Sequence, residues 1–300
     1  MKLYVIDTGF FKLDGGAMYG VVPKSIWNKL NPADENNLCD WALRCLLIED
    51  DDRLILVDCG NGDKQDEKFF SHYYLHGTQS LDTALAKHGF GSDDITDVFL
   101  THLHFDHCGG AIKRVDGKLV TAFKNAIYWS NKPHWDSAVR PNDREKASFL
   151  KENILPIQES GQLQFVEHPL WGAVKDEAKE WTSFAYSTRI SASSFTENMT
   201  VRFVDGHTHA MMLPQINYNG KTIVYMADLL PSVGHIPIPY VMAYDMFPLS
   251  TLQEKKMFLE EAVDNNYILF FEHDPLYECC TLQRTEKGIR LKSTFKLSEL

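Results

Sequence analysis

Short apolar runs separated by polar turns recur along the chain and predict β-strands. The run 95–100 is β-branched and apolar, which predicts a buried strand. Runs at 199–204, 221–226 and 267–271 have the same character. Each of the four is followed closely by His or Asp residues, so we expect these side chains on loops at strand ends, held by a rigid scaffold.

Strands are also predicted towards both ends of the chain. Residues 1–7 have the pattern of a strand. The runs 44–49 and 53–58 are joined by three aspartates and predict a hairpin. Residues 286–288 have the sequence Glu-Lys-Gly between two strand-like runs, which indicates a closing hairpin.

Two segments have a helical pattern. Residues 80–89 predict a short helix with Ser80 as its N-cap. Residues 249–266 predict a longer helix, in which Ser250 and Gln253 form a capping box. The apolar face of this helix is expected to contain Leu252, Leu259 and Val263.

The segment 131–198 contains Pro, Trp and charged residues with weak periodicity. We expect helices and a substrate-side insertion there, without defined boundaries, and assign no function to its His134 and His168. No repeat, low-complexity tract or linker divides the sequence, so residues 1–300 are interpreted as one domain. The apolar content of 44% suits a globular protein with a buried core.

Charge and cysteine content exclude some classes of function. The formal charge of −11 argues against nucleic acid or an anionic membrane as the main partner, because both need a basic surface. No apolar run approaches the ~20 residues of a membrane span, and the N-terminus lacks the pattern of a signal peptide. The six cysteines show no Cys-x-x-Cys spacing, so we expect reduced thiols and a cytoplasmic location.

The loop after the strand at 95–100 has the densest metal-binding chemistry. Four side chains that can bind a metal, His102, His104, Asp106 and His107, fall within six residues. Groups crowded this closely repel or desolvate one another unless a cation compensates. His102 and His104 share a face of an extended segment, whereas Asp106 and His107 follow where the chain turns, so one loop could supply two adjacent metals. The alternative is a His-rich surface loop, which the preceding buried strand disfavours.

The His-x-His-x-Asp-His run formed by His102, His104, Asp106 and His107 resembles the signature of the metallo-β-lactamase superfamily of metal-dependent hydrolases. That family adds a His, an Asp and a His far downstream. This chain offers all three in the expected order, as His207, Asp228 and His273. The resemblance covers nearly the whole chain.

The resemblance implies an α/β fold, the metallo-β-lactamase αββα four-layer sandwich, in which two mixed β-sheets are flanked by helices. It also implies two metal ions. The family pattern assigns His102, His104 and His207 to the first ion, Asp106, His107 and His273 to the second, and Asp228 to a bridge between them. His209 is the rival of His207, but the family pattern places the ligand directly after Gly206.

Nitrogen and oxygen ligands without a thiolate suit two divalent ions, with Zn expected first and Mn, Fe or Co as alternatives. The ions would acidify a bridging water towards a pKa near ~7, and the resulting hydroxide would attack a carbonyl or phosphoryl group. Asp106 and Asp228 are therefore expected to take part in catalysis. We also expect His235 and Tyr244, which lie in and just after a proline-rich strip, to bind substrate or protonate a leaving group, with structural hydrogen bonding as the alternative.

Smaller features leave alternatives open. Cys108 is interpreted as a packing residue rather than a ligand, and Gly109 and Gly110 allow the chain to turn after the loop.

Asp58 is either a partner of a metal-bound His, as the resemblance implies, or a plain turn residue. The apolar, glycine-rich segment 14–23 resembles one in the lactonase-like and organophosphate-hydrolase-like branches, and it forms a pocket wall, a dimer contact or a cover over the core.

Our first hypothesis for function is a dinuclear hydrolase of a small ester or lactone of the acyl-homoserine type. The second is a phosphotriester or organophosphate hydrolase. A glyoxalase-type thioesterase is less favoured because no basic patch for glutathione carboxylates is evident, and a non-catalytic metal-binding protein is disfavoured because the ligand set is unbroken. The expected partner is a small-molecule substrate, and a homodimer remains open.

Overall fold

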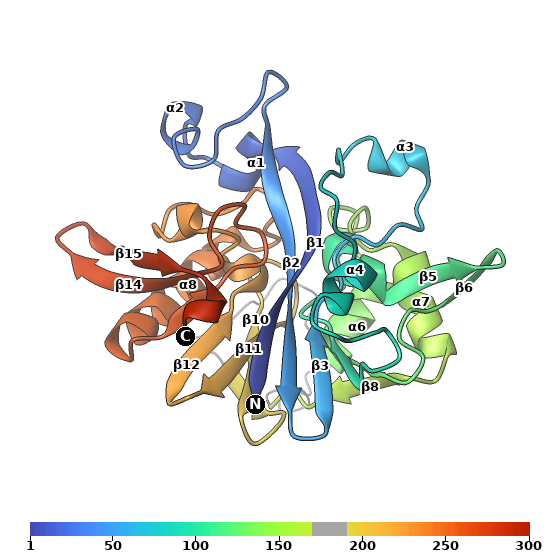
Figure 1. The fold of residues 1–300 in the computed structure, drawn as a ribbon. Helices are drawn as coiled ribbons and strands as arrows, with labels where there is room; N and C mark the ends of the chain where they lie inside the picture. The colour runs from blue at the N-terminus through green and yellow to red at the C-terminus, as the bar shows by residue number, and fades with distance from the viewer. Residues whose placement is uncertain (170–190) are drawn as a thin grey trace, which may run out of the picture.

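The structure, a computed structural model, describes residues 1–169 and 191–300, and within them two large β-sheets lie at the centre of the molecule (Figure 1). The first sheet has the strand order β1-β2-β3-β4-β7-β8 and contains both antiparallel and parallel pairs. Its strands are β1 (Lys2–Asp14), β2 (Leu38–Asp50), β3 (Arg53–Val57), β4 (Asp97–Phe99), β7 (Ile127–Asn131) and β8 (Leu163–Val166).

The second sheet is also mixed, with the order β15-β14-β13-β12-β11-β10-β9 and one parallel pair, β12 with β13. Its strands are β9 (Ser191–Ser194), β10 (Met199–Val204), β11 (Met211–Tyr218), β12 (Lys221–Tyr225), β13 (Ile268–Phe270), β14 (Cys279–Thr285) and β15 (Gly288–Phe295). A separate hairpin is formed by β5 (Ile112–Val115) and β6 (Lys118–Thr121).

Most helices are short and connect or flank the strands. They are α1 (Gly15–Tyr19), α2 (Lys24–Trp27), α3 (Glu67–Phe70), α4 (Leu81–Ala86), α5 (Phe105–Cys108), α6 (Lys132–Val139), α7 (Lys151–Glu159) and α8 (Pro248–Asp264). Single 3-10 turns occur at η1 (Gly109–Ala111), η2 (Ala227–Leu229), η3 (Val233–His235) and η4 (Leu297–Glu299). None of these helices combines the length and apolarity needed to cross a membrane.

The two faces of β2 show how the layers are built. Side chains alternate along a strand, so Leu46 and Ile48 point to one face and Cys45 and Leu47 to the other. The first pair belongs to the core shared with the second sheet and α8, and the second pair packs with α4, α6 and α7. The order helices, sheet, sheet, helix confirms the predicted αββα sandwich, and α8 lies on the opposite side of the molecule from α6 and α7 (Figure 1).

The apolar pattern located most of the elements that carry site residues. The strands expected at 95–100, 199–204, 221–226 and 267–271 are β4, β10, β12 and β13. The hairpin of β2 and β3, the closing hairpin of β14 and β15, and helix α4 with its Ser80 cap are also confirmed. Helices α6 and α7 lie inside the segment 131–198, whose residues 170–190 are outside the described part.

Two expectations about local structure were wrong or incomplete. Helix α8 starts at Pro248 after Phe247, with no side-chain cap, so the predicted capping box of Ser250 and Gln253 does not form. A proline suits the first helical turn, where an N–H would lack a partner. Strand β11 was not predicted, because Pro214 interrupts its apolar run.

Arg44 of β2 fixes the loop after β13 to the first sheet. Its side chain is buried, and Nη1 donates to the carbonyl oxygens of Phe271, Asp274 and Tyr277 at 2.9, 3.0 and 3.2 Å. The same loop carries His273. A charged donor thereby links the two sheets at a point where the backbone would otherwise leave buried oxygens without partners.

We expect Arg44→Met to lower the free energy of unfolding by about 2–4 kcal/mol, because three buried carbonyl oxygens lose their donor. Urea denaturation of purified protein measures the change. Arg284→Met is the matched control, since Arg284 is half exposed and its ion pairs contribute little. Equal stability of the Arg44 variant and the control would contradict the role given to Arg44.

Candidate metal centre

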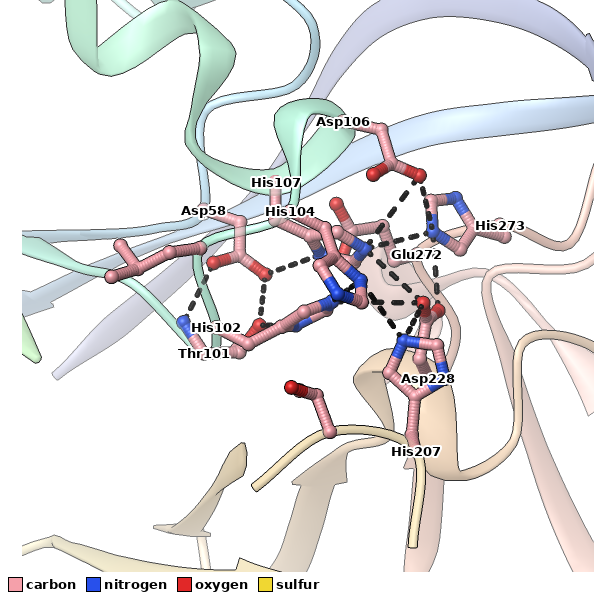
Figure 2. A network of polar contacts seen from close by, with 12 residues as sticks. Asp58, Thr101, His102, His104, Asp106, His107, His207, Asp228, Glu272 and His273 are labelled. Atoms are coloured by element: carbon pink, nitrogen blue, oxygen red, sulfur yellow. Dashed lines mark hydrogen bonds and ion pairs between the residues drawn. The ribbon is translucent and has the colours of Figure 1, made fainter. Parts of the chain in front are cut away.

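Loops from both sheets converge on one site between them (Figure 2). The loop after β4, with α5, supplies side chains from the first sheet, and the segments after β10, β12 and β13 supply side chains from the second. Each of these residues is at most 8% exposed. The residues brought together are His102, His104, Asp106, His107, His207, Asp228 and His273.

A first group of donor atoms surrounds a common centre. Nε2 of His102 and Nε2 of His207 lie 3.1 and 3.2 Å from Nδ1 of His104. Oδ2 of Asp228 lies 3.0 Å from Nε2 of His207 and 3.7 Å from Nε2 of His102. Four ligands arranged tetrahedrally around zinc at about 2.0–2.1 Å lie about 3.4 Å from one another, so this spacing fits a metal ion.

A second group lies beside the first. Nε2 of His107 and Nε2 of His273 are 3.2 Å apart. Oδ2 of Asp106 lies 3.8 and 3.7 Å from these two nitrogens. The spacing again suits a single metal ion.

Asp228 lies between the two groups. Besides its contacts in the first group, Oδ2 is 3.5 Å from Nε2 of His107 and Oδ1 is 3.3 Å from Nε2 of His273. Oδ1 is buried and accepts no hydrogen bond. The carboxylate is therefore placed as a bridging ligand would be.

The outer nitrogen of every histidine in the site faces a hydrogen-bond acceptor. The acceptors are Thr101 Oγ1 for His102 (3.0 Å), Glu145 Oε1 for His104 (3.2 Å), Asp58 Oδ2 for His107 (3.1 Å), Asp245 Oδ1 for His207 (2.9 Å) and the Ala42 carbonyl for His273 (2.8 Å). Glu272 Oε2 forms an ion-pair contact with Nδ1 of His107 at 2.9 Å. Such acceptors fix the tautomer, because the outer nitrogen carries the proton.

This arrangement explains why the residues fit metal ions. When the outer nitrogens of His102 and His104 carry the protons, their inner nitrogens face each other with lone pairs at 3.1 Å. Lone pairs at that distance repel unless a positive charge lies between them. Oδ1 of Asp228, which is buried and accepts no hydrogen bond, also needs a positive charge beside it. The inner nitrogens and oxygens of the site therefore need cations between them.

The pKa values also indicate that the centre of the site needs positive charge. Burial lowers the pKa of His207 and His273, but Asp228 and other carboxylates outweigh burial and raise the values to about 10 and about 9. Burial opposes ionisation of Asp228, yet His207, His107 and His273 hold its pKa well below the usual range. Burial, with the neighbouring His107 and His104, keeps the pKa of His102 well below its ordinary value. Without metal ions, protons on His207 and His273 would supply the positive charge.

Close backbone packing positions the ligands. A Cβ on Gly206 would lie 2.3 Å from the backbone nitrogen of Thr251 in α8, so only glycine fits directly before His207. The backbone N–H groups of Asp205 and Gly206 donate to the buried carboxylate of Glu254. Glycine is therefore needed here for space.

The loop of His102 is held in a similar way. Nε2 of His134 accepts the backbone N–H of Leu103, and Nδ1 of His134 donates to the His209 carbonyl. A Cβ on Gly109 would lie 2.1 Å from the Asn61 carbonyl oxygen, which explains the glycine after the loop by close approach.

A cavity of about 370 Å³ opens onto the site. Its polar lining includes His104, Asp106, His207, Asp228 and His273. Its remaining wall is largely apolar and comes from the N-terminal segment, from α5 and from the residues before α8, namely Leu13, Met18, Phe105, Met242 and Met246. Tyr244 and Arg144 also line it. The placement of Met18 favours the pocket-wall interpretation of segment 14–23.

His235 does not line this cavity, which corrects the expectation that it binds substrate or takes part in catalysis. It is 1% exposed, with Nδ1 2.9 Å from Ser232 Oγ and Nε2 2.9 Å from the Met18 carbonyl oxygen. Its ring stacks on Tyr19. Burial lowers its pKa to about 3, so the structural alternative holds.

The structure distinguishes between the alternatives that the sequence left open for three other residues. His209 contacts Asp205 at 3.0 Å and lies outside the metal-binding groups, whereas His207 lies inside them. The Cys108 thiol donates to the Leu103 carbonyl and packs in the core, as a packing residue should. Asp58 accepts hydrogen bonds from Thr101 and contacts His107, so it is not a plain turn residue.

Several residues that support the histidines were missed. Glu145 lies in the segment that could not be interpreted, and Asp245 and Thr101 were passed over beside Tyr244 and His102. Glu272 directly precedes His273 and follows a buried strand, which was a usable signal. The partners of Glu145 and Asp245 become evident only in three dimensions, because His104 and His207 are far from them in sequence.

Comparisons with known proteins find similarity to one superfamily over part of the chain and a shared fold over nearly all of it. Residues 43–179 match the profile of the Metallo-beta-lactamase superfamily. An N-acyl homoserine lactonase of Bacillus cereus is 28% identical over 165 residues, which make up 52% of this chain and 56% of that protein. The match thus spans little more than half the length of this curated relative.

Two solved structures cover almost the whole chain. A probable metal-dependent hydrolase from Staphylococcus aureus has a TM-score of 0.81 and 24% identity, and covers 98% of each chain. AidC, a dizinc quorum-quenching lactonase in complex with a product, has a TM-score of 0.75 and 21% identity over 98% of this chain and 95% of its own. Identities this low show a shared fold.

We expect metal binding to release protons, because His207 and His273 have pKa values of about 10 and about 9 without metal. Affinity should therefore rise with pH between about pH 6 and about pH 9. Calorimetric titration of metal-free protein in buffers of different ionisation enthalpy measures the release. A binding enthalpy independent of the buffer would contradict the prediction.

Proposed function

We propose that this chain is a metal-dependent hydrolase of the metallo-β-lactamase superfamily that holds two divalent ions and hydrolyses small esters or lactones. The match of residues 43–179 to that superfamily and the fold shared with a probable metal-dependent hydrolase support the proposal. The first ion would be held by His102, His104 and His207, and the second by Asp106, His107 and His273. Asp228 would bridge them. Zn is the expected metal, with Mn, Fe or Co as alternatives.

The convergence of inner nitrogens and carboxylate oxygens at the base of a cavity carries this proposal. A purely structural cluster would pair its inner nitrogens with protein groups, just as the outer N–H groups here are paired with acceptors. A buried structural metal would also be closed to substrate. Here the cavity wall includes His104, Asp228 and His273, so a small molecule can reach the proposed ions.

Bound metal ions would acidify a water molecule and polarise the scissile carbonyl. The chain's own residues orient the reactants. Glu145 and Asp245 hold the rings of His104 and His207, and this prevents rotation that would displace the ligands. Tyr244 lines the cavity and carries a phenolic O–H that can donate to a substrate oxygen or to a leaving alkoxide.

The substrate class follows from the cavity and the relatives. An apolar wall containing Leu13, Met18 and Met242 suits an acyl chain beside a polar reacting centre. Related curated proteins are N-acyl homoserine lactonases, so lactones of that type are the first substrates to test. Hydrolysis adds water across the acyl carbon–oxygen bond and gives a carboxylic acid and an alcohol.

We expect Asp228→Ala to lose at least one metal ion and to lower kcat/KM by about three orders of magnitude, because the variant lacks the proposed bridge. Elemental analysis should find about two ions per wild-type chain. Asp264→Ala is the matched control, since Asp264 lies on α8 and is exposed. Retention of both ions and of activity in the Asp228 variant would refute the bridging role.

A substrate panel tests the reaction class. Metal-loaded protein should hydrolyse acyl-homoserine lactones and aryl esters above the rate of metal-free protein, and phosphotriesters more slowly. Tyr244→Phe should lower kcat about tenfold to a hundredfold, if its O–H assists the leaving group. Hydrolysis of phosphotriesters alone would replace our first hypothesis with the second one.

A further inference from the structure

Arg144 is the one lysine or arginine among the described residues that line the cavity over the candidate metal centre. It lies on the loop between α6 and α7, directly before Glu145. The Glu145 side chain turns inwards to His104 and Thr208. Arg144 instead faces the cavity from the outer part of the same loop.

The guanidinium of Arg144 has N–H donors that form no hydrogen bond within the described residues. Its Nη2 donates to the Ala243 carbonyl oxygen. Within residues 1–169 and 191–300, no carboxylate forms an ion pair with it, although acidic residues outnumber basic ones by 41 to 30 in the sequence. A guanidinium has five N–H donors in a fork that matches a carboxylate or a phosphate.

The charge of Arg144 itself favours an anion here. The neighbouring Glu145, which lines the same cavity, already contacts His104 and Thr208. Arg144 therefore presents a positive charge on the cavity wall without an ion-pair partner among the described residues, in a chain whose overall charge is −11. Such a charge attracts anionic substrates.

One molecule can reach both groups, because Arg144 and the proposed metal ligands His104, His207 and Asp228 line the same cavity of about 370 Å³. We propose that Arg144 selects esters or lactones that carry an anionic group, such as a carboxylate, remote from the scissile bond. This inference rests on the proposed hydrolase function and narrows its substrate class.

Two matched esters test the proposal. The first is the mono-para-nitrophenyl ester of adipic acid, which has a free carboxylate, and the second is the same compound with that carboxylate methylated. Wild-type protein should prefer the anionic ester about tenfold or more in kcat/KM, as expected for a charge-assisted hydrogen bond. Added salt should reduce the preference.

Arg144→Met should abolish most of the preference, and Arg144→Lys should retain part of it, because lysine keeps the charge but not the fork. Arg140→Met is the control, since Arg140 is 77% exposed and does not line the cavity. If the Arg144→Met variant slows on both esters equally, Arg144 only tethers Ala243 and the proposal is overturned. An unchanged preference in this variant overturns it as well.

A binding measurement separates this inference from the function itself. If wild-type protein hydrolyses neither these two esters nor any member of the substrate panel, the hydrolase proposal fails. Calorimetric titration of metal-loaded protein with monomethyl adipate then decides the role of Arg144. Weaker binding to the Arg144→Met variant than to the Arg140→Met control supports an anion site, and equal binding overturns it.

Discussion

The structure depends on a concentration of lone pairs that only cations can neutralise. Five imidazoles and two carboxylates lie within a site where each residue is at most 8% exposed. Their outer atoms are fixed by acceptors such as Glu145, Asp245 and the Ala42 carbonyl. The inner atoms have no comparable partner, so the free energy of this arrangement depends on what positive charge occupies its centre.

The need for positive charge at this site also links the two sheets. The loop of His102 to His107 extends from the first sheet, whereas His207, Asp228 and His273 follow strands of the second. Metal ions held by both sets would act as a cross-link between layers that otherwise meet through the apolar core and through contacts such as those of Arg44. Ions that bind only the folded chain stabilise it by mass action, so folding and metal binding are expected to be coupled.

The sequence could indicate the parts of this site that are local. His102, His104, Asp106 and His107 are close in sequence and follow a buried strand, so their spacing alone suggested two metals. The three remote ligands came from resemblance to a family, because no local pattern connects His207 or His273 with this loop. Glu145 is a residue that the sequence analysis missed, and His235 is one to which it gave a substrate role that its contacts do not support. Glu145 has no sequence signal, and His235 follows the Asp228 loop closely yet packs against Tyr19 behind the pocket wall.

The candidate metal centre and the mouth of the cavity are formed by different segments of the chain. The groups proposed to react therefore differ from the groups proposed to select substrates. The ligands sit at strand ends and on short turns, and Ala227 before Asp228 has a positive φ of 41°, a backbone conformation that costs about 1–3 kcal/mol and persists only where the surrounding structure enforces it. The mouth consists of three segments distant in sequence. Ala243 joins them, since its N–H donates to the Ala17 carbonyl and its own carbonyl accepts from Arg144. These contacts use other atoms than the hydrogen bonds of Glu145 and Asp245 to the histidines, although Arg144 directly precedes Glu145 and Ala243 lies two residues before Asp245. Conservative substitutions at the mouth are therefore the ones expected to change which molecules enter while the groups proposed to hold the ions stay in place.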